Sequence, residues 1–125
     1  MKRLFSVVLA LLLAVQLPAR VKLPAVLGSN MVLQRNAEVN FWGEASPRSR
    51  VRVTASWDGR MHETRADASG RWALKLPTGE AGGPYTVTLS DGEPLVLDNV
   101  LVGEVWVCSG QSNMEMPVSG FMFQP

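Results

Sequence analysis

Cysteine and histidine are almost missing from this 125-residue sequence, which contains one residue of each kind, Cys108 and His62. A single cysteine excludes a disulfide within the chain, and one thiol with one imidazole cannot build a structural zinc site. An excess of either charge is also missing, because 12 Lys and Arg residues accompany 11 Asp and Glu residues. The basic residues are scattered, which argues against nucleic acid as a partner. We expect no metal ion and no organic cofactor.

Helical periodicity is missing from residues 20–102, where no stretch repeats apolar residues at spacings of three and four over two turns. Internal repeats and low-complexity tracts are absent as well. Apolar and polar residues instead alternate with a period of two between turn signals, which is typical of an antiparallel all-β domain. The number of short strands fits a sandwich. The sequence therefore predicts a mainly β fold, with an antiparallel β-sandwich accessory domain at residues 20–102.

The clearest predicted strand runs from Val51 to Trp57, and its alternate residues from Val51 onward are expected to face a core. Asp58-Gly59 then predicts a hairpin turn, and the more polar segment Met61–Ala66 predicts an edge strand. A Gly- and Pro-rich stretch at 77–84 predicts a surface loop. Further strands are expected at Met31–Gln34, Val39–Trp42, Arg71–Leu76 and Tyr85–Leu89.

Residues 1–19 have the build of a secretory signal peptide. Lys2 and Arg3 precede an apolar run from Leu4 to Val15, and cleavage is expected after Ala19. The alternative is a membrane-spanning helix, but the run is shorter than the ~20 residues that cross a bilayer. A cleaved signal predicts a periplasmic or extracellular protein that has no membrane contact after cleavage.

The pattern changes near residue 103, which predicts the start of a second domain at 103–125. The apolar run from Gly103 to Cys108 favours a buried strand that leads into helix-compatible residues. Ser112 would then lie beyond the carboxyl end of that strand, where α/β sheets bind ligands. A chain of 125 residues cannot hold a sandwich and a whole hydrolase domain. We therefore expect the second domain to be incomplete, and the apolar end at 121–125 fits a truncated chain.

The segment 101–117, with Gly-Gln-Ser-Asn-Met at 110–114, resembles the first motif block of the sialate O-acetylesterases, members of the SGNH hydrolase superfamily. The resemblance also covers residues 29–35, 39–43 and 70–72. A short Gly-x-Ser match arises often by chance and needs a structural context. The strand expected before the serine and the additional matching segments supply that context.

The resemblance implies that Ser112 is the nucleophile of a serine carboxylic-ester hydrolase and that its backbone N–H is one oxyanion donor. An unassisted serine hydroxyl is too weak a nucleophile and needs a histidine base oriented by a carboxylate. Members of the family supply these from an Asp-x-x-His segment near the end of a longer chain, and add a glycine N–H and an asparagine side chain to the oxyanion hole. Without these groups, the 125-residue chain is expected to be inactive.

Several residues around the motif have a structural alternative. Ser112 could be a helix N-cap, and Gln111 and Asn113 could bind substrate or brace the turn, as could Glu115. Cys108 could be a thiol nucleophile, but its place at the end of an apolar strand favours a small buried hydrophobe. We keep Ser112 as the catalytic residue and Gln111 and Asn113 as candidate substrate-binding residues.

Four residues of the predicted sandwich have alternative roles as well. His62 precedes the nucleophile, whereas the family's base follows it, so a surface position on a strand is expected. Trp42, Trp57 and Trp72 could stack on sugar rings, but tryptophans on alternating strand faces are more often core residues. The sequence therefore predicts all three in the core.

The resemblance implies an esterase that removes O-acetyl groups from sialic acid or other glycans, including plant glycans such as acetylated xylan. The alternative is a secreted β-sandwich carbohydrate-binding or structural module in which residues 110–114 are a structural tail. Its support is that nearly all of the predicted complete strands belong to the sandwich.

Overall fold

The computed structural model describes residues 20–115 and residue 117. The predicted signal peptide at 1–19 and the apolar end at 121–125 lie outside the described residues. Within the described part of the chain, no helix is long and apolar enough to cross a membrane.

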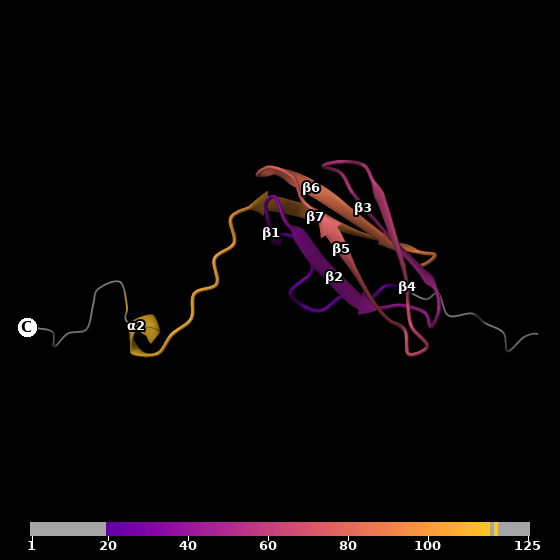
Figure 1. The fold of residues 1–125 in the computed structure, drawn as a ribbon, viewed down its shortest axis with the longest axis horizontal. Helices are drawn as coiled ribbons and strands as arrows, with labels where there is room; N and C mark the ends of the chain where they lie inside the picture. Colours follow the sequence, from indigo (N-terminus) through magenta and orange to yellow (C-terminus); the bar gives the residue numbers. More distant parts are fainter. Residues whose placement is uncertain (1–19, 116, 118–125) are drawn as a thin grey trace, which may run out of the picture.

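The described residues form two β-sheets followed by one short helix (Figure 1). A five-stranded sheet has the order β1-β7-β6-β3-β4, and a two-stranded sheet pairs β2 with β5. The mainly β prediction is confirmed. The elements are β1 (Val32–Gln34), β2 (Glu38–Glu44), β3 (Arg50–Ala55), β4 (Met61–Arg65), β5 (Arg71–Pro77), β6 (Gly82–Ser90), β7 (Pro94–Gly103) and α2 (Ser112–Glu115).

One pair of strands departs from the expected antiparallel arrangement. β1 runs parallel to β7, with Val32 opposite Leu101 and Gln34 opposite Gly103. Parallel neighbours need a long connection and cannot be joined by a tight turn. Here the connection contains the whole of β2 to β6. The pairing of β1 with β7 therefore could not be predicted from a turn in the sequence.

Strand β3 shows why the alternating pattern folds as it does. Val51, Val53 and Ala55 are fully buried, whereas the residues between them face outward or are half-buried. The chain then reverses through Gly59, which has a φ of 66°, and returns as β4 at the edge of the sheet. A positive φ costs glycine little because it has no Cβ. The predicted hairpin and edge strand are confirmed.

The two sheets share one hydrophobic core. Phe41 of β2 and Leu76 of β5 are fully buried in the same cluster as Val53, Val87 and Val100 of the five-stranded sheet. Among the described residues, no polar or charged residue is buried. Removing this apolar surface from water is the main force that holds the two sheets together.

The tryptophans divide between core and surface. Trp72 is buried at 4% exposure, and Trp57 is half-buried and packs against the core. The core prediction is wrong for Trp42, which is 42% exposed on β2. Alternation separates two faces of a strand, but on a two-stranded sheet it does not identify the face that remains open.

A hydrogen-bonded turn at 67–70 carries the chain from β4 in one sheet to β5 in the other. The Asp67 carboxylate accepts hydrogen bonds from the Ser69 hydroxyl at 2.7 Å and from the backbone N–H groups of Ser69 and Arg71 at 2.8 and 2.9 Å. These bonds favour the charged carboxylate, the Ser69 hydroxyl most strongly, and lower the pKa of Asp67. Gly70 completes the turn with a φ of 88°.

Replacing Gly70 with Ala is expected to destabilise the fold by at least about 1 kcal/mol. The new Cβ would lie 2.5 Å from the backbone oxygen of Ala45, and the backbone at Gly70 is already left-handed. Gly28→Ala is the matched control, because a Cβ there meets no atom within 4 Å. Denaturant unfolding measures both variants, and equal midpoints would contradict this description of the turn.

Candidate active site

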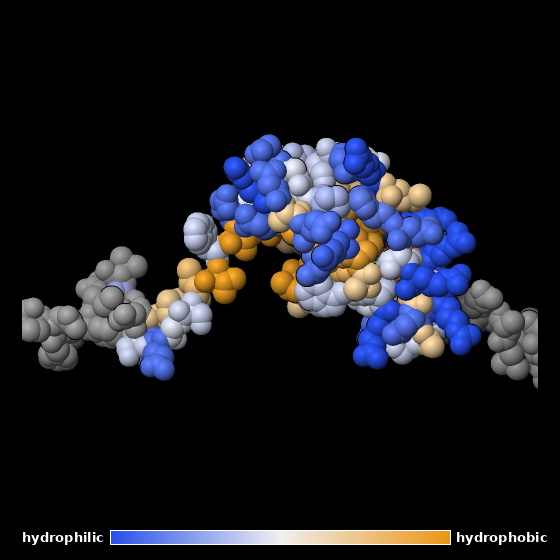
Figure 2. Space-filling model, in the orientation of Figure 1, coloured by the Kyte–Doolittle hydropathy of each residue, from blue (hydrophilic) through white to orange (hydrophobic). Residues whose placement is uncertain are grey.

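The segment between the sheets and α2 does not form the predicted strand. β7 ends at Gly103, and residues 104–110 are extended coil (Figure 1). Val105, Trp106 and Val107 are 46%, 84% and 92% exposed, and Figure 2 shows apolar atoms on the segment that leads to α2. A strand needs a neighbour for its N–H and C=O groups, and none of the described strands pairs with this segment. The prediction of a buried strand is therefore wrong for this chain.

The prediction that Cys108 is buried is also wrong. The sequence places it at the end of an apolar strand, where burial was expected, but the residue is exposed and free. Its exposure has the same cause as that of Trp106, because both lie on a segment that nothing among the described residues covers.

The start of this segment is held to β1 by a set of polar contacts. The side-chain amide of Gln34 donates from Nε2 to Glu104 Oε2 at 2.9 Å, and its Oε1 accepts the N–H of Val105 at 2.8 Å. Arg35 donates its backbone N–H to Gly103 O at 2.8 Å and pairs with Glu104 through Nε at 3.4 Å. These contacts direct the chain as it leaves β7. They join residues about 70 positions apart, and no local pattern could have predicted them.

The Gly110–Met114 motif forms a tight turn into the four-residue helix α2. The N–H of Met114 donates to Gln111 O at 2.9 Å, and a Cβ at Gly110 would lie 2.9 Å from Met114 Cγ. A glycine therefore allows the turn to close. Gln111 and Ser112 are exposed, which leaves the Ser112 hydroxyl accessible to a reagent or a substrate. Asn113 lies in α2, and its side chain is outside what the structure describes.

The structure brings no histidine to Ser112. The chain's single histidine, His62, lies on β4 opposite Val53, which confirms the predicted strand, but it is half-buried instead of at the surface, and its Nε2 is buried without a hydrogen-bond partner among the described residues. Figure 1 shows β4 and α2 at opposite ends of the described molecule. Among residues 20–115, no cluster of three His, Cys, Asp or Glu side chains could hold a metal ion. Among the described residues, the candidate site is therefore a serine on an exposed turn, without a histidine beside it.

No protein-family model matches the chain. The chain is 31% identical to a sialate O-acetylesterase from Mus musculus over 92% of its length and 36% identical to a sialate O-acetylesterase from Pongo abelii over 74%. It spans 24% and 20% of those two relatives. Among solved structures, a carbohydrate acetylesterase from Xanthomonas citri matches 80% of the chain with 40% identity and a TM-score of 0.71. The match covers 23% of that structure.

Exposure of Cys108 predicts that a thiol reagent will modify the native chain. We expect one equivalent of 5,5′-dithiobis(2-nitrobenzoate) to react without denaturant, at a rate within about tenfold of that in guanidinium. The variant Cys108→Ala sets the zero baseline, because Cys108 is the only cysteine. A thiol that reacts only after unfolding would show that residues 104–108 are buried.

Proposed function

The chain is a homologue of the sialate O-acetylesterases over a limited part of their length, and we propose that it belongs to a serine esterase that removes acetyl groups from carbohydrates. The observation that carries the proposal is the similarity to the Mus musculus relative. A match that covers 92% of a 125-residue chain must extend past Ser112. The similarity to the Xanthomonas citri carbohydrate acetylesterase supports the same class of substrate.

In the proposed reaction, the Ser112 hydroxyl attacks the carbonyl carbon of an acetyl ester. The sugar oxygen leaves with a proton, an acetyl-serine forms, and water then releases acetate. The Ser112 N–H donates one hydrogen bond to the oxyanion. A histidine base, an orienting carboxylate and the other oxyanion donors come from the part of the enzyme beyond these residues. Gln111 and Asn113 flank the nucleophile and are the candidates for substrate contact.

If the rest of the active site lies outside this chain, the exposure of residues 104–108, just before Ser112, has a simple explanation. We propose that residues 20–102 are a β-sandwich accessory domain and that residues 103–125 begin an SGNH hydrolase domain. In the complete enzyme, residues 104–108 pair with further strands of that domain. Burial of the exposed side chains of Trp106 and Val107 would contribute about 1.5–3 kcal/mol for each large apolar side chain.

An exported enzyme fits this function, because acetylated glycans are available outside the cytoplasm. The basic and apolar residues at 1–19 support export by a cleavable signal peptide. The proposed location is the periplasm or the extracellular space.

A second candidate function is a secreted carbohydrate-binding or structural module without catalysis. It is favoured by one observation, which is that all seven described strands and their core are complete without residues 104–115. The two functions differ in what they require of Ser112, since only an esterase needs its hydroxyl.

Replacing Ser112 with Ala in the full-length enzyme is expected to lower kcat/KM for 4-nitrophenyl acetate by at least about 10³-fold. The thermal midpoint is measured on the same variant, so that a loss of activity is separated from a loss of folding. Ser109→Ala is the matched control, as it removes an exposed hydroxyl three positions earlier on the same segment and is expected to retain activity. Undiminished turnover in the Ser112 variant would rule out the proposed nucleophile.

A further inference from the structure

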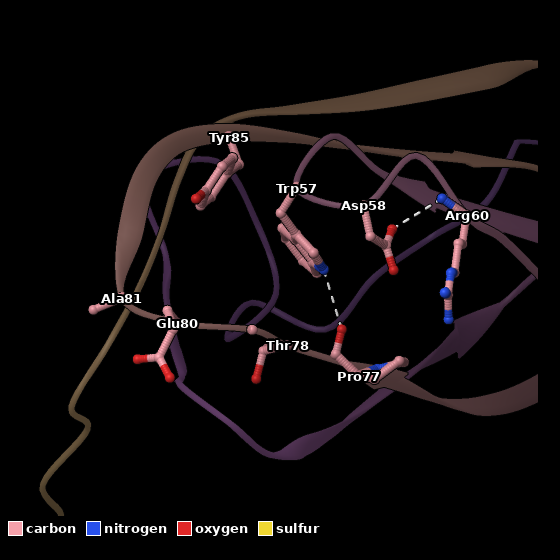
Figure 3. A pocket seen from close by; sticks show the side chains of 9 residues that line it. Trp57, Asp58, Arg60, Pro77, Thr78, Glu80, Ala81 and Tyr85 are labelled. Atoms are coloured by element: carbon pink, nitrogen blue, oxygen red, sulfur yellow. Dashed lines mark hydrogen bonds between the residues drawn. The ribbon is translucent and has the colours of Figure 1, made fainter.

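A cavity of about 420 Å³ opens between the turn that follows β3 and the loop that precedes β6 (Figure 3). This volume lies within the ~300–1,000 Å³ typical of small-molecule sites. The turn contributes an aromatic and two charged residues, the loop contributes the opposite wall, and β6 contributes a second aromatic. The lining residues include Trp57, Asp58, Arg60, Pro77, Glu80 and Tyr85.

Two aromatic rings form a fixed wall of this cavity. The rings of Trp57 and Tyr85 meet edge to face, with centroids 5.7 Å apart and an interplanar angle of 74°. The indole Nε1 of Trp57 donates to the backbone oxygen of Pro77 at 3.1 Å, as Figure 3 shows. Because the only N–H of its side chain is already bonded, the Trp57 side chain offers a ligand its ring and no donor. Both residues are half-buried, so part of each ring is open while the rest is held in place.

Two charged side chains face the cavity from the side opposite Tyr85 (Figure 3). Arg60 and Asp58 are exposed, and the Asp58 carboxylate accepts the backbone N–H of Arg60 at 2.9 Å. Within residues 20–115, the Arg60 guanidinium makes no ion pair. Glu80 is different, because Arg35 and Asn36 already bind its carboxylate at 3.7 and 3.0 Å. The cavity thus combines aromatic surface with one free guanidinium and one partly free carboxylate.

We propose that this cavity binds one pyranose ring of a carbohydrate. A pyranose has an apolar face of C–H groups, which packs on an aromatic ring, and a rim of hydroxyls, which bond to charged side chains. Trp57 and Tyr85 supply the aromatic rings, and Asp58 and Arg60 supply the charged side chains. A sugar carboxylate, as in sialic acid, would meet the guanidinium of Arg60. The choice of carbohydrate as ligand rests on the proposed function.

The position of the cavity relates it to the nucleophile segment. The loop at 77–81 precedes Gly82, which pairs with Val102 near the end of β7. Arg35 connects this loop to the exit of the chain, since it pairs with Glu80 at 3.7 Å and with Glu104 at 3.4 Å. The cavity therefore lies at the end of the β-domain from which the chain continues to Ser112. A glycan held there would be retained beside the hydrolase domain.

Titration of the isotope-labelled chain with N-acetylneuraminic acid and, separately, with xylotriose tests this site. We expect saturable shifts of the Trp57 indole N–H resonance, and of the backbone N–H resonances of Gly79 and Glu80, which line the cavity and remain observable in every variant. The expected Kd is on the order of 1 mM, a modest affinity suited to one subsite. Trp57→Phe and Arg60→Ala are each expected to weaken binding at least about threefold. Trp42→Ala is the matched control, because Trp42 is an exposed tryptophan that lines a different cavity of the same volume.

Binding of both sugars supports recognition of the ring face, and binding of N-acetylneuraminic acid alone, lost in Arg60→Ala, supports recognition through the guanidinium. Absence of shifts for both sugars at about 10 mM, or binding that neither variant weakens, would overturn the proposal. Because Trp57 also packs on the core, the thermal midpoint of its variant is checked, and Arg60→Ala keeps the test decisive if Trp57→Phe unfolds. Sugar binding needs no Ser112 hydroxyl, so failure of this site and failure of the proposed esterase are read from separate assays.

Discussion

The pairing requirement of the β-strand backbone governs both the fold and the candidate site. β7 pairs with β6 as far as Val102 and with β1 as far as Gly103, and beyond that point none of the described strands pairs with the chain. The next residues are as apolar as a buried strand, yet Trp106 is 84% exposed. An unpaired strand would leave its N–H and C=O groups without partners once buried. The need for strand partners thus ends the β-domain at Gly103. It also leaves the segment before Ser112 available to pair with further strands.

Long-range contacts of two residues, Gln34 and Arg35, connect this open segment to the rest of the molecule. The Gln34 amide and the Arg35 side chain fix the direction in which the chain leaves β7. Arg35 also contacts Glu80, which belongs to the wall of the aromatic cavity. The β-domain therefore does more than precede Ser112. It sets the exit of the chain and presents the proposed sugar site at the same end.

Alternation was sufficient to predict β1 to β6 and the buried face of β3, because Val51 and Val53 differ from their neighbours in polarity, but no strand was predicted at Pro94–Gly103, where β7 lies. It could not predict the parallel β1–β7 pair or the exposure of Trp42, since both depend on which distant strands become neighbours. Ser112 was identified by its motif, whereas the Trp57–Tyr85 cavity joins residues from separate loops and carries no local signal. Burial at 104–108 was mispredicted because apolar composition indicates a suitable strand and does not supply its partner.

The proposed role of Ser112 is that of a nucleophile whose activation depends on groups outside the 125-residue chain. A fluorophosphonate reagent reports this directly, because it modifies a serine that a neighbouring base has activated. Intact-mass analysis of the 125-residue chain is predicted to show no adduct after an incubation that fully modifies Ser112 in the full-length enzyme. A stoichiometric adduct on Ser112 of the isolated chain would contradict the account.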